Sequence, residues 1–166
     1  LYTLMRQFLS HKSWRIIMTN TIKTSIIRDV TLNYAFLDTP HAPFGGDPVF
    51  DVQVVVPKKR RKELEAFGKV REVEGGVAIN IKRYAKDAKG KAVKVDVVTA
   101  TKEDFRAEYG NASCIGNGSK GAIKVFTYPR GEQTITRLSA VQVTELKKYE
   151  PTPTVDFDSI EASEDF

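Results

Sequence analysis

Alternation of hydrophobic and polar residues predicts a chain built mostly of β-strands between about residue 30 and residue 149. In segment 77–84, Val77, Ile79 and Ile81 fall on one face, and Lys82 and Tyr84 fall on the other. Comparable strand patterns occupy 31–39, 49–56, 92–100, 122–130 and 133–149. In the last of these segments the hydrophobic positions shift register after residue 138, which predicts a β-bulge.

Two stretches between the strands have helical rather than strand character. Residues 58–68 contain many helix formers, and Gly68 follows as a stop signal. Residues 101–110 suit a short helix with Thr101 as the N-cap and Gly110 at its end. Five or six strands with one or two short helices predict an all-β fold. We expect an OB-fold, a five-stranded Greek-key barrel, and a β-sandwich is the alternative that periodicity leaves open.

The composition divides the chain into three parts. Residues 1–24 are expected to be a flexible extension. Hydrophobic residues at helical spacing and the absence of acids in 1–17 superficially resemble a transit peptide, but an upstream extension of a chain starting at Met18 is the preferred interpretation. Residues 25–149 form the predicted domain. Residues 150–166 are rich in proline, acids and small polar residues, and we expect a disordered acidic tail.

Charge is distributed unevenly over these parts. The chain has a net charge of +5, yet residues 150–166 contain six acidic residues and no basic one. A basic body with an acidic tail suggests a polyanion-binding surface and a detachable polyanion mimic. A solubilising tail on a mildly basic domain is the alternative. Cys114 is the only cysteine, so no intramolecular disulfide can form and a reducing compartment is the simplest interpretation.

Several predicted strands combine an aliphatic face with a face of cations and aromatic rings. Single-stranded nucleic acid is bound in this way, because cations follow the phosphates and rings stack on the bases. A solvated sheet face with lysines for solubility is the alternative. The candidate binding residues are Lys58, Lys59, Arg60, Arg61, Lys82, Arg83, Tyr84, Lys86, Lys89, Lys91, Lys94, Lys120, Lys124, Phe126, Tyr128 and Arg130, with Phe36 or Phe44 as further stacking candidates.

The basic run at 58–62 is the densest of these clusters. Cations at the start of a helix oppose the helix dipole, and an anionic partner would relieve that strain. The Gly-rich stretch 116–121 lacks the spacing of a phosphate-binding loop and precedes a strand, which argues against nucleotide hydrolysis. The aspartates near residues 38–51 have no metal-ligand spacing. We therefore expect no cofactor, no metal and no catalytic residue.

Four stretches resemble the single-stranded DNA-binding proteins of podovirus-type bacteriophages. GDPVFDVQVVVPK is similar to the family's glycine-x-proline followed by a strand, and VKVDVVTATK to its valine-rich strand. CIGNGSKGAIKVFTYP resembles its glycine- and serine-rich loop with the following strand, and VDFDSIEASEDF its acidic tail with a terminal aromatic residue. The resemblance covers about residues 25–166. The segment between Pro57 and Val77 is shorter than the helical insertion of the family.

The resemblance implies an OB-fold protein that coats single-stranded DNA during phage replication and recombination, in the cytoplasm of an infected bacterial host. It also implies a homodimer whose tail contacts the phage DNA polymerase and primase-helicase and competes with DNA. The tail residues expected to make these contacts are Asp156, Asp158, Glu161, Glu164, Asp165 and Phe166. An RNA-binding OB-type protein and a small phage nucleic-acid enzyme are the alternatives.

Overall fold

The computed structural model describes residues 22–149 of the chain. Its strands are β1 (Lys23–His41), β2 (Val49–Val56), β3 (Arg71–Val73), β4 (Gly76–Tyr84), β5 (Asp96–Thr99), β6 (Ser119–Arg130) and β7 (Gln133–Glu145). Its helices are the 3₁₀ turn η1 (Lys58–Arg60) and the short α-helices α2 (Arg61–Glu65) and α3 (Phe105–Tyr109).

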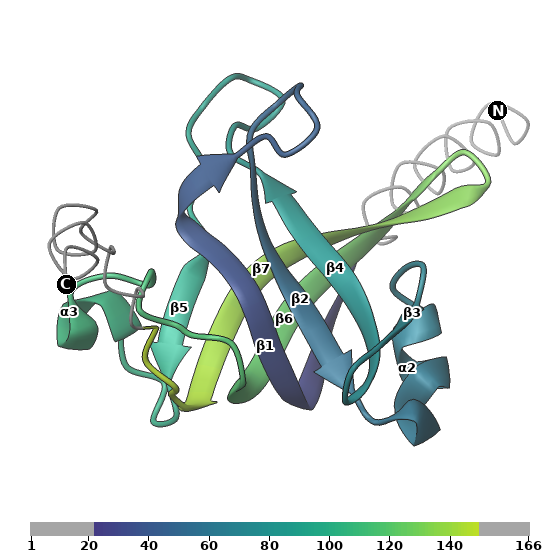
Figure 1. Ribbon diagram of the computed structural model, residues 1–166. Helices are drawn as coiled ribbons and strands as arrows, with labels where there is room; N and C mark the ends of the chain where they lie inside the picture. Colours follow the sequence, from purple (N-terminus) through teal and green to yellow (C-terminus); the bar gives the residue numbers. More distant parts are fainter. Residues whose placement is uncertain (1–21, 150–166) are drawn as a thin grey trace, which may run out of the picture.

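The strands form one curled sheet in the order β3-β4-β2-β1-β6-β7-β5 (Figure 1). The long strand β1 is central and pairs antiparallel with both β2 and β6, while β5 runs parallel to β7. The two halves of the sheet meet where β4 lies against β7, and there the Arg83 guanidinium donates to the Leu138 carbonyl oxygen at 3.3 Å. Five long strands thus make the predicted OB-fold barrel, and β3 and β5 are short additions to it.

The strand alternation that the sequence predicts is confirmed in the core. Val77, Ile79 and Ile81 of β4 are buried, while Lys82 and Tyr84 are exposed. The matching positions of β2, β6 and β7 fill the same interior, and α2 and α3 add Leu64 and Phe105. The predicted bulge lies in β7, because the β6–β7 register skips one residue between its positions 138 and 140.

Three local predictions differ from the structure. Thr101 is not the N-cap of α3. Asp104 is, and its carboxylate accepts a hydrogen bond from the backbone N–H of Arg106 at 3.1 Å. Thr101 instead pairs its hydroxyl with that of Thr99 within the preceding turn. The strand expected at 92–100 is reduced to β5, and β1 begins at Lys23, earlier than the hydrophobic alternation suggests.

The expectations for the extension up to residue 21 and for the tail from residue 150 lie outside the described residues. Among residues 22–149, no helix is long and apolar enough to cross a membrane. In the same range, no group of three or more His, Cys, Asp or Glu side chains is arranged to hold a metal ion.

Candidate nucleic-acid interface

The middle of β1 is distorted so that aromatic side chains stand on its outer face. The β1–β2 register shifts between Asn33 and Phe36, and Tyr34 has a φ of +49°, in the left-handed region that non-glycine residues rarely adopt. Two hydrogen bonds hold this distortion: the Tyr34 N–H donates to Asn117 Oδ1 at 2.8 Å, and the Gly118 N–H donates to Asn33 Oδ1 at 2.9 Å. As a result the Tyr34 side chain is 60% exposed and that of Phe36 is 44% exposed.

Phe36 is held in place by a histidine. The ring of His41, at the end of β1, stacks on the Phe36 ring with centroids 4.1 Å apart and an angle of 23°. His41 Nε2 in turn lies 2.8 Å from Asp51 Oδ1 on the neighbouring strand β2. Phe36 therefore has one ring face fixed by His41, and its exposed part is available to stack on a ligand.

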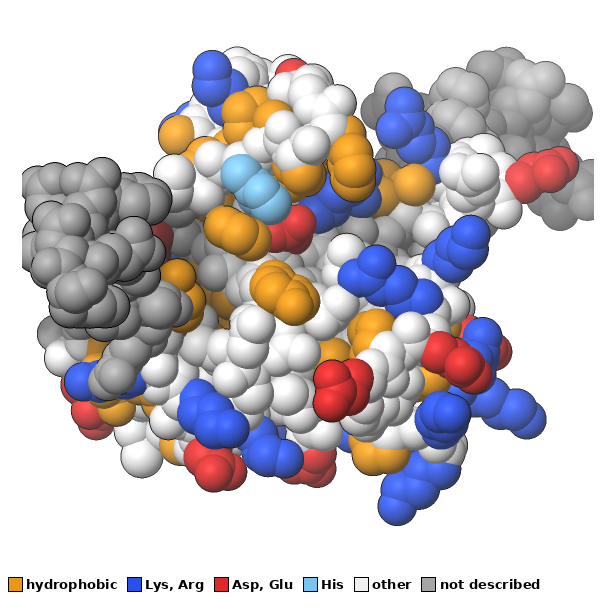
Figure 2. Space-filling view, in the orientation of Figure 1, with side chains coloured by type: hydrophobic (Ala, Val, Ile, Leu, Met, Phe, Trp, Pro, Cys, Tyr) orange, Lys and Arg blue, Asp and Glu red, His pale blue; other side chains and the backbone are white. Residues whose placement is uncertain are grey.

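The strand register places these groups in one row. Phe36 of β1 is opposite Asp51 of β2, and Asp51 is opposite Lys82 of β4. The next row contains Asn33, Gln53 and Asn80, of which the first two are linked by a 3.4 Å hydrogen bond. Figure 2 shows the histidine of this face beside acidic and hydrophobic side chains. The outer face of β1, β2 and β4 thus combines exposed rings with polar groups, and we call it the β1–β2–β4 face.

At the end of β4, cations lie over aromatic rings. Lys82 Nζ is 5.2 Å from the centroid of the Tyr84 ring, and the guanidinium carbon of Arg137 is 5.0 Å from the same ring. These separations are within the range of cation–π attraction. Tyr84 is therefore an exposed ring with two positive charges beside it, the combination that stacks a base and neutralises its phosphate.

A second aromatic pair lies beside Tyr84 on β6. Phe126 and Tyr128 stack on each other with centroids 6.3 Å apart, and the Arg83 guanidinium lies 5.1 Å from the Phe126 ring. Together with Tyr84 and Arg137, these residues line a hollow of about 270 Å³. Because Arg83 is half-buried and bonded to a β7 carbonyl oxygen, its main contact is with the barrel.

The fold is similar to that of solved phage proteins. The single-stranded DNA-binding protein of bacteriophage Enc34 superimposes with a TM-score of 0.55 at 13% identity, covering 83% of this chain and 89% of that one. Its C-terminal truncation gives 0.54 at 16% identity, covering 78% and 88%, and its complex with single-stranded DNA gives 0.55 at 13%, covering 80% and 89%. No protein-family model and no curated protein matches the sequence. The likeness confirms the fold that the sequence motifs indicated.

The structure separates the candidate residues into groups. Lys82, Arg83, Tyr84, Phe126 and Tyr128 come together at the end of β4. The exposed lysines of the following loop, Lys86, Lys89, Lys91 and Lys94, continue from this cluster, and Arg130 is exposed at the β6–β7 turn. Phe44, in the β1–β2 loop, is 99% exposed. Lys120 and Lys124 lie elsewhere, on β6, where their strand-register partners are Thr31 and Ile26 of β1.

The basic run at 58–62 lies at the opposite end of the barrel. Val49 of β2 is opposite Tyr84, whereas Val56, directly before the run, is opposite Val77. Eight residues of extended strand separate the two ends by roughly 20 Å. The run is therefore not continuous with the aromatic cluster along β2 and β4.

Two arginines of this run are engaged in local contacts. Arg60 donates to the backbone carbonyl oxygens of Arg28 and Asp29, at 2.7 Å each, and pairs with Glu63 at 2.8 Å. Its hydrogen bond to Glu63 raises the pKa of Arg60 despite partial burial, and the same bond lowers the pKa of Glu63. Arg61 pairs with Glu65 at 3.0 Å. The unfavourable interaction between these cations and the helix dipole is thus offset within the helix, because acidic side chains one turn later pair with the arginines.

The sequence-based candidates omitted several residues of the interface, namely Tyr34, His41, Asp51 and Arg137. For Tyr34, the spacing of the neighbouring leucines was an indication that sequence reasoning could have used. Leu32 and Leu37 are both buried although they are five residues apart, and this spacing is incompatible with a regular strand. A bulge between them turns Tyr34 outward. The positions of His41 and Arg137 depend on strand pairings that the sequence alone does not specify.

Proposed function

We propose that this chain is a binding protein that coats single-stranded DNA without sequence preference, and that the β1–β2–β4 face is its binding surface. The observation that supports this most strongly is the set of exposed rings, Tyr34, Phe36 and Tyr84, on one face of the sheet. The Phe36 ring is stacked on His41, and the Tyr84 ring lies beside the Lys82 ammonium group. Stacking tolerates every base, because every base has a π-face. The likeness to phage single-stranded DNA-binding proteins supports the same ligand.

In this proposal the phosphates follow the basic rim rather than the middle of the face. Asp51 places a carboxylate between Phe36 and Lys82, and a carboxylate repels phosphate. Lys82, Arg137 and the lysines of the β4–β5 loop lie at the edge of the face. Bases are therefore directed toward the sheet, and the backbone is directed outward to the cations and to solvent.

We further propose a role in phage DNA replication and recombination, as a homodimer in the cytoplasm of the infected bacterium. The acidic segment 150–166 would contact the DNA polymerase and primase-helicase and compete with DNA for the basic surface. Its composition supports this, because segment 150–166 contains six acidic residues and no basic one, whereas basic residues exceed acidic ones in the rest of the chain. The family resemblance described above supports the choice of partners.

The test is fluorescence anisotropy with labelled oligo-dT and a duplex of equal length, measured over a series of salt concentrations. The full chain is compared with a chain that ends at Tyr149. We expect preference for the single strand, affinity that falls as salt rises, and tighter binding after truncation. Equal weak binding to both DNAs would refute the proposed function. Unchanged affinity after truncation would refute the competition by the tail alone.

A further inference from the structure

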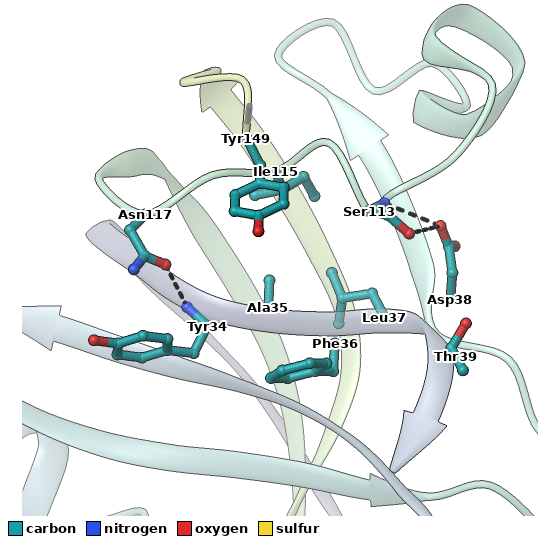
Figure 3. A pocket seen from close by; sticks show the side chains of 10 residues that line it. All are labelled: Tyr34, Ala35, Phe36, Leu37, Asp38, Thr39, Ser113, Ile115, Asn117 and Tyr149. Atoms are coloured by element: carbon teal, nitrogen blue, oxygen red, sulfur yellow. Dashed lines mark hydrogen bonds between the residues drawn. The ribbon is translucent and has the colours of Figure 1, made fainter. Parts of the chain in front are cut away.

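A second hollow lies directly beside the β1–β2–β4 face, and the proposed function does not use it. It has a volume of about 480 Å³, within the range of small-ligand sites. Tyr34, Phe36 and Ala35 of β1 form one side, and Ile115, Asn117 and Tyr149 lie across from them (Figure 3). Because Tyr34 and Phe36 border both the face and the hollow, a strand bound on the face passes the mouth of the hollow.

The wall of this hollow is fixed by backbone hydrogen bonds. The Tyr149 N–H donates to the Cys114 carbonyl oxygen at 2.7 Å, and the Gly116 N–H donates to the Lys147 carbonyl oxygen at 2.7 Å. The bond between Tyr34 and Asn117 closes the other end. The hollow is therefore a preformed site, and ligand binding would require little ordering of the chain.

The lining has the chemistry that a nucleobase requires. Figure 3 shows the ring of Tyr149 above Ala35, with its hydroxyl group pointing into the hollow. Tyr149 is 60% exposed, so its ring face is open to stacking. The Asn117 amide and the Ser113 hydroxyl supply polar groups at the edges, where the hydrogen-bonding edge of a base would lie.

The charges at the rim favour a nucleotide. Asp38 borders the hollow, but its carboxylate pairs with Arg106 at 2.7 Å and accepts hydrogen bonds from the backbone and hydroxyl of Ser113, at 3.0 and 3.2 Å. Its negative charge is thus compensated. The Lys147 side chain lies over Gly118, where its Nζ would be 3.3 Å from a Cβ built on that glycine. Gly118 follows Asn117 in the chain, so this ammonium group lies close to the rim of the hollow, where it can hold a phosphate.

We propose that the hollow receives one nucleobase turned out of the bound single strand, stacked on Tyr149 and flanked by Ala35. This inference rests on the proposed function, because the strand on the β1–β2–β4 face delivers the base. Turning a base outward costs least in a single strand, where no pairing is lost. The site gives one nucleotide per protomer a fixed position in an otherwise sequence-tolerant interface.

The test uses two variants of the full chain, Ala35→Leu, which fills the hollow, and Tyr149→Ala, which removes the ring. Tyr109→Ala is the control, since Tyr109 is another exposed tyrosine, on α3, outside the hollow. Anisotropy is measured with labelled oligo-dT and with an abasic oligomer of equal length. We expect both variants to lower affinity for oligo-dT about 5- to 100-fold and to leave affinity for the abasic oligomer unchanged.

The outcomes separate the two proposals. If the wild type prefers oligo-dT and both variants retain that affinity, the base site is refuted while the proposed function stands. If the wild type binds the abasic oligomer as well as oligo-dT, stacking is refuted and the base site with it. Thermal unfolding checks the fold of Ala35→Leu. If that variant is unfolded, Tyr149→Ala decides, because this exposed side chain contributes little to the core.

Discussion

The Asp38 carboxylate joins three parts of the chain, and replacing it by asparagine should measurably destabilise the domain. Its Oδ1 accepts from Arg106 Nε at 2.7 Å, and its Oδ2 accepts from the backbone N–H groups of Ala112 and Ser113, at 2.6 and 3.0 Å. Arg106 also donates to the carbonyl oxygens of Leu37 and Val95. One ion pair therefore ties α3 and the following loop to β1 and to the segment before β5.

The magnitude follows from the burial of the pair. The side chains of Arg106 and Asp38 are 15% and 20% exposed. Removing one partner of a buried pair costs about 3–5 kcal/mol, and an exposed pair contributes less than about 1 kcal/mol. For Asp38→Asn we expect a loss of about 2–3 kcal/mol in the free energy of unfolding at pH 7. In a domain of this size that loss lowers Tm by about 6–15 °C.

The loss should depend on pH. Burial alone would raise the pKa of Asp38, but the hydrogen bonds from Arg106, Ala112 and Ser113 outweigh it and hold the pKa below its ordinary value of 3.8. A lowered pKa means that the carboxylate stabilises the fold above its unfolded pKa, and that this stabilisation is lost as pH falls through the folded pKa. The difference between wild type and Asp38→Asn should be constant from pH 7 to 5 and shrink below about pH 4.

The assay is urea denaturation followed by circular dichroism at pH 7, 5 and 3. Asp96→Asn serves as the control, because Asp96 is an exposed carboxylate in β5 and should change stability by less than about 0.5 kcal/mol. An Asp38→Asn protein as stable as the wild type at pH 7 would show that the Asp38–Arg106 pair does not stabilise the domain. A difference between the two proteins that stays the same down to pH 3 would contradict the expected pH dependence.

Three further predictions concern the barrel and its interface. Gly121→Ala should cost at least about 2 kcal/mol in urea denaturation, because a Cβ there would collide with the Gln142 carbonyl oxygen on β7. Phe36→Ala should weaken binding of oligo-dT about 5- to 100-fold in anisotropy, with the salt dependence unchanged, since a ring and no charge is removed. Replacing both Lys82 and Lys86 by glutamine should lower the slope of log affinity against log salt by up to about 1.4.

Each of these predictions has a matched control. Gly68→Ala should be nearly neutral, because nothing lies within 4 Å of a Cβ at that position and its φ is not positive. Tyr109→Ala should leave DNA affinity unchanged. Replacing Lys58 and Lys59, beyond the opposite end of β2, should reduce the salt slope less than replacing Lys82 and Lys86. Equal slopes in the two double variants would show that the interface extends to η1.

Strand alternation was sufficient to predict most of the barrel from the sequence. Val77, Ile79 and Ile81 fill the core from one face of β4, although Ala78 on the other face is buried as well. The same reasoning located the bulge of β7. The N-cap of α3 was predicted wrongly because Thr101 and Asp104 are both capping residues, and only the turn geometry selects between them.

The interface was less accessible to sequence reasoning because it depends on pairings between distant strands. Composition identified Lys82, Tyr84, Phe126 and Tyr128 as cations and rings on strands, and the structure brings them together. The run at 58–62 has a higher charge density than this cluster. It lies at the other end of the barrel because the whole length of β2 separates the two.

The stacking of His41 on Phe36 arises because β1 is irregular between these two residues, where the register with β2 shifts. A linear pattern contains no information about that contact.

Chemical-shift mapping by NMR would show whether bases stack on the β1–β2–β4 face. Backbone amides of isotope-labelled protein would be followed during titration with oligo-dT. We expect the largest shifts at Tyr34, Phe36, His41 and Tyr84, with smaller shifts in the β4–β5 loop. Shifts concentrated at Lys58–Arg61, with the amides of β1 and β4 unmoved, would contradict stacking on this face.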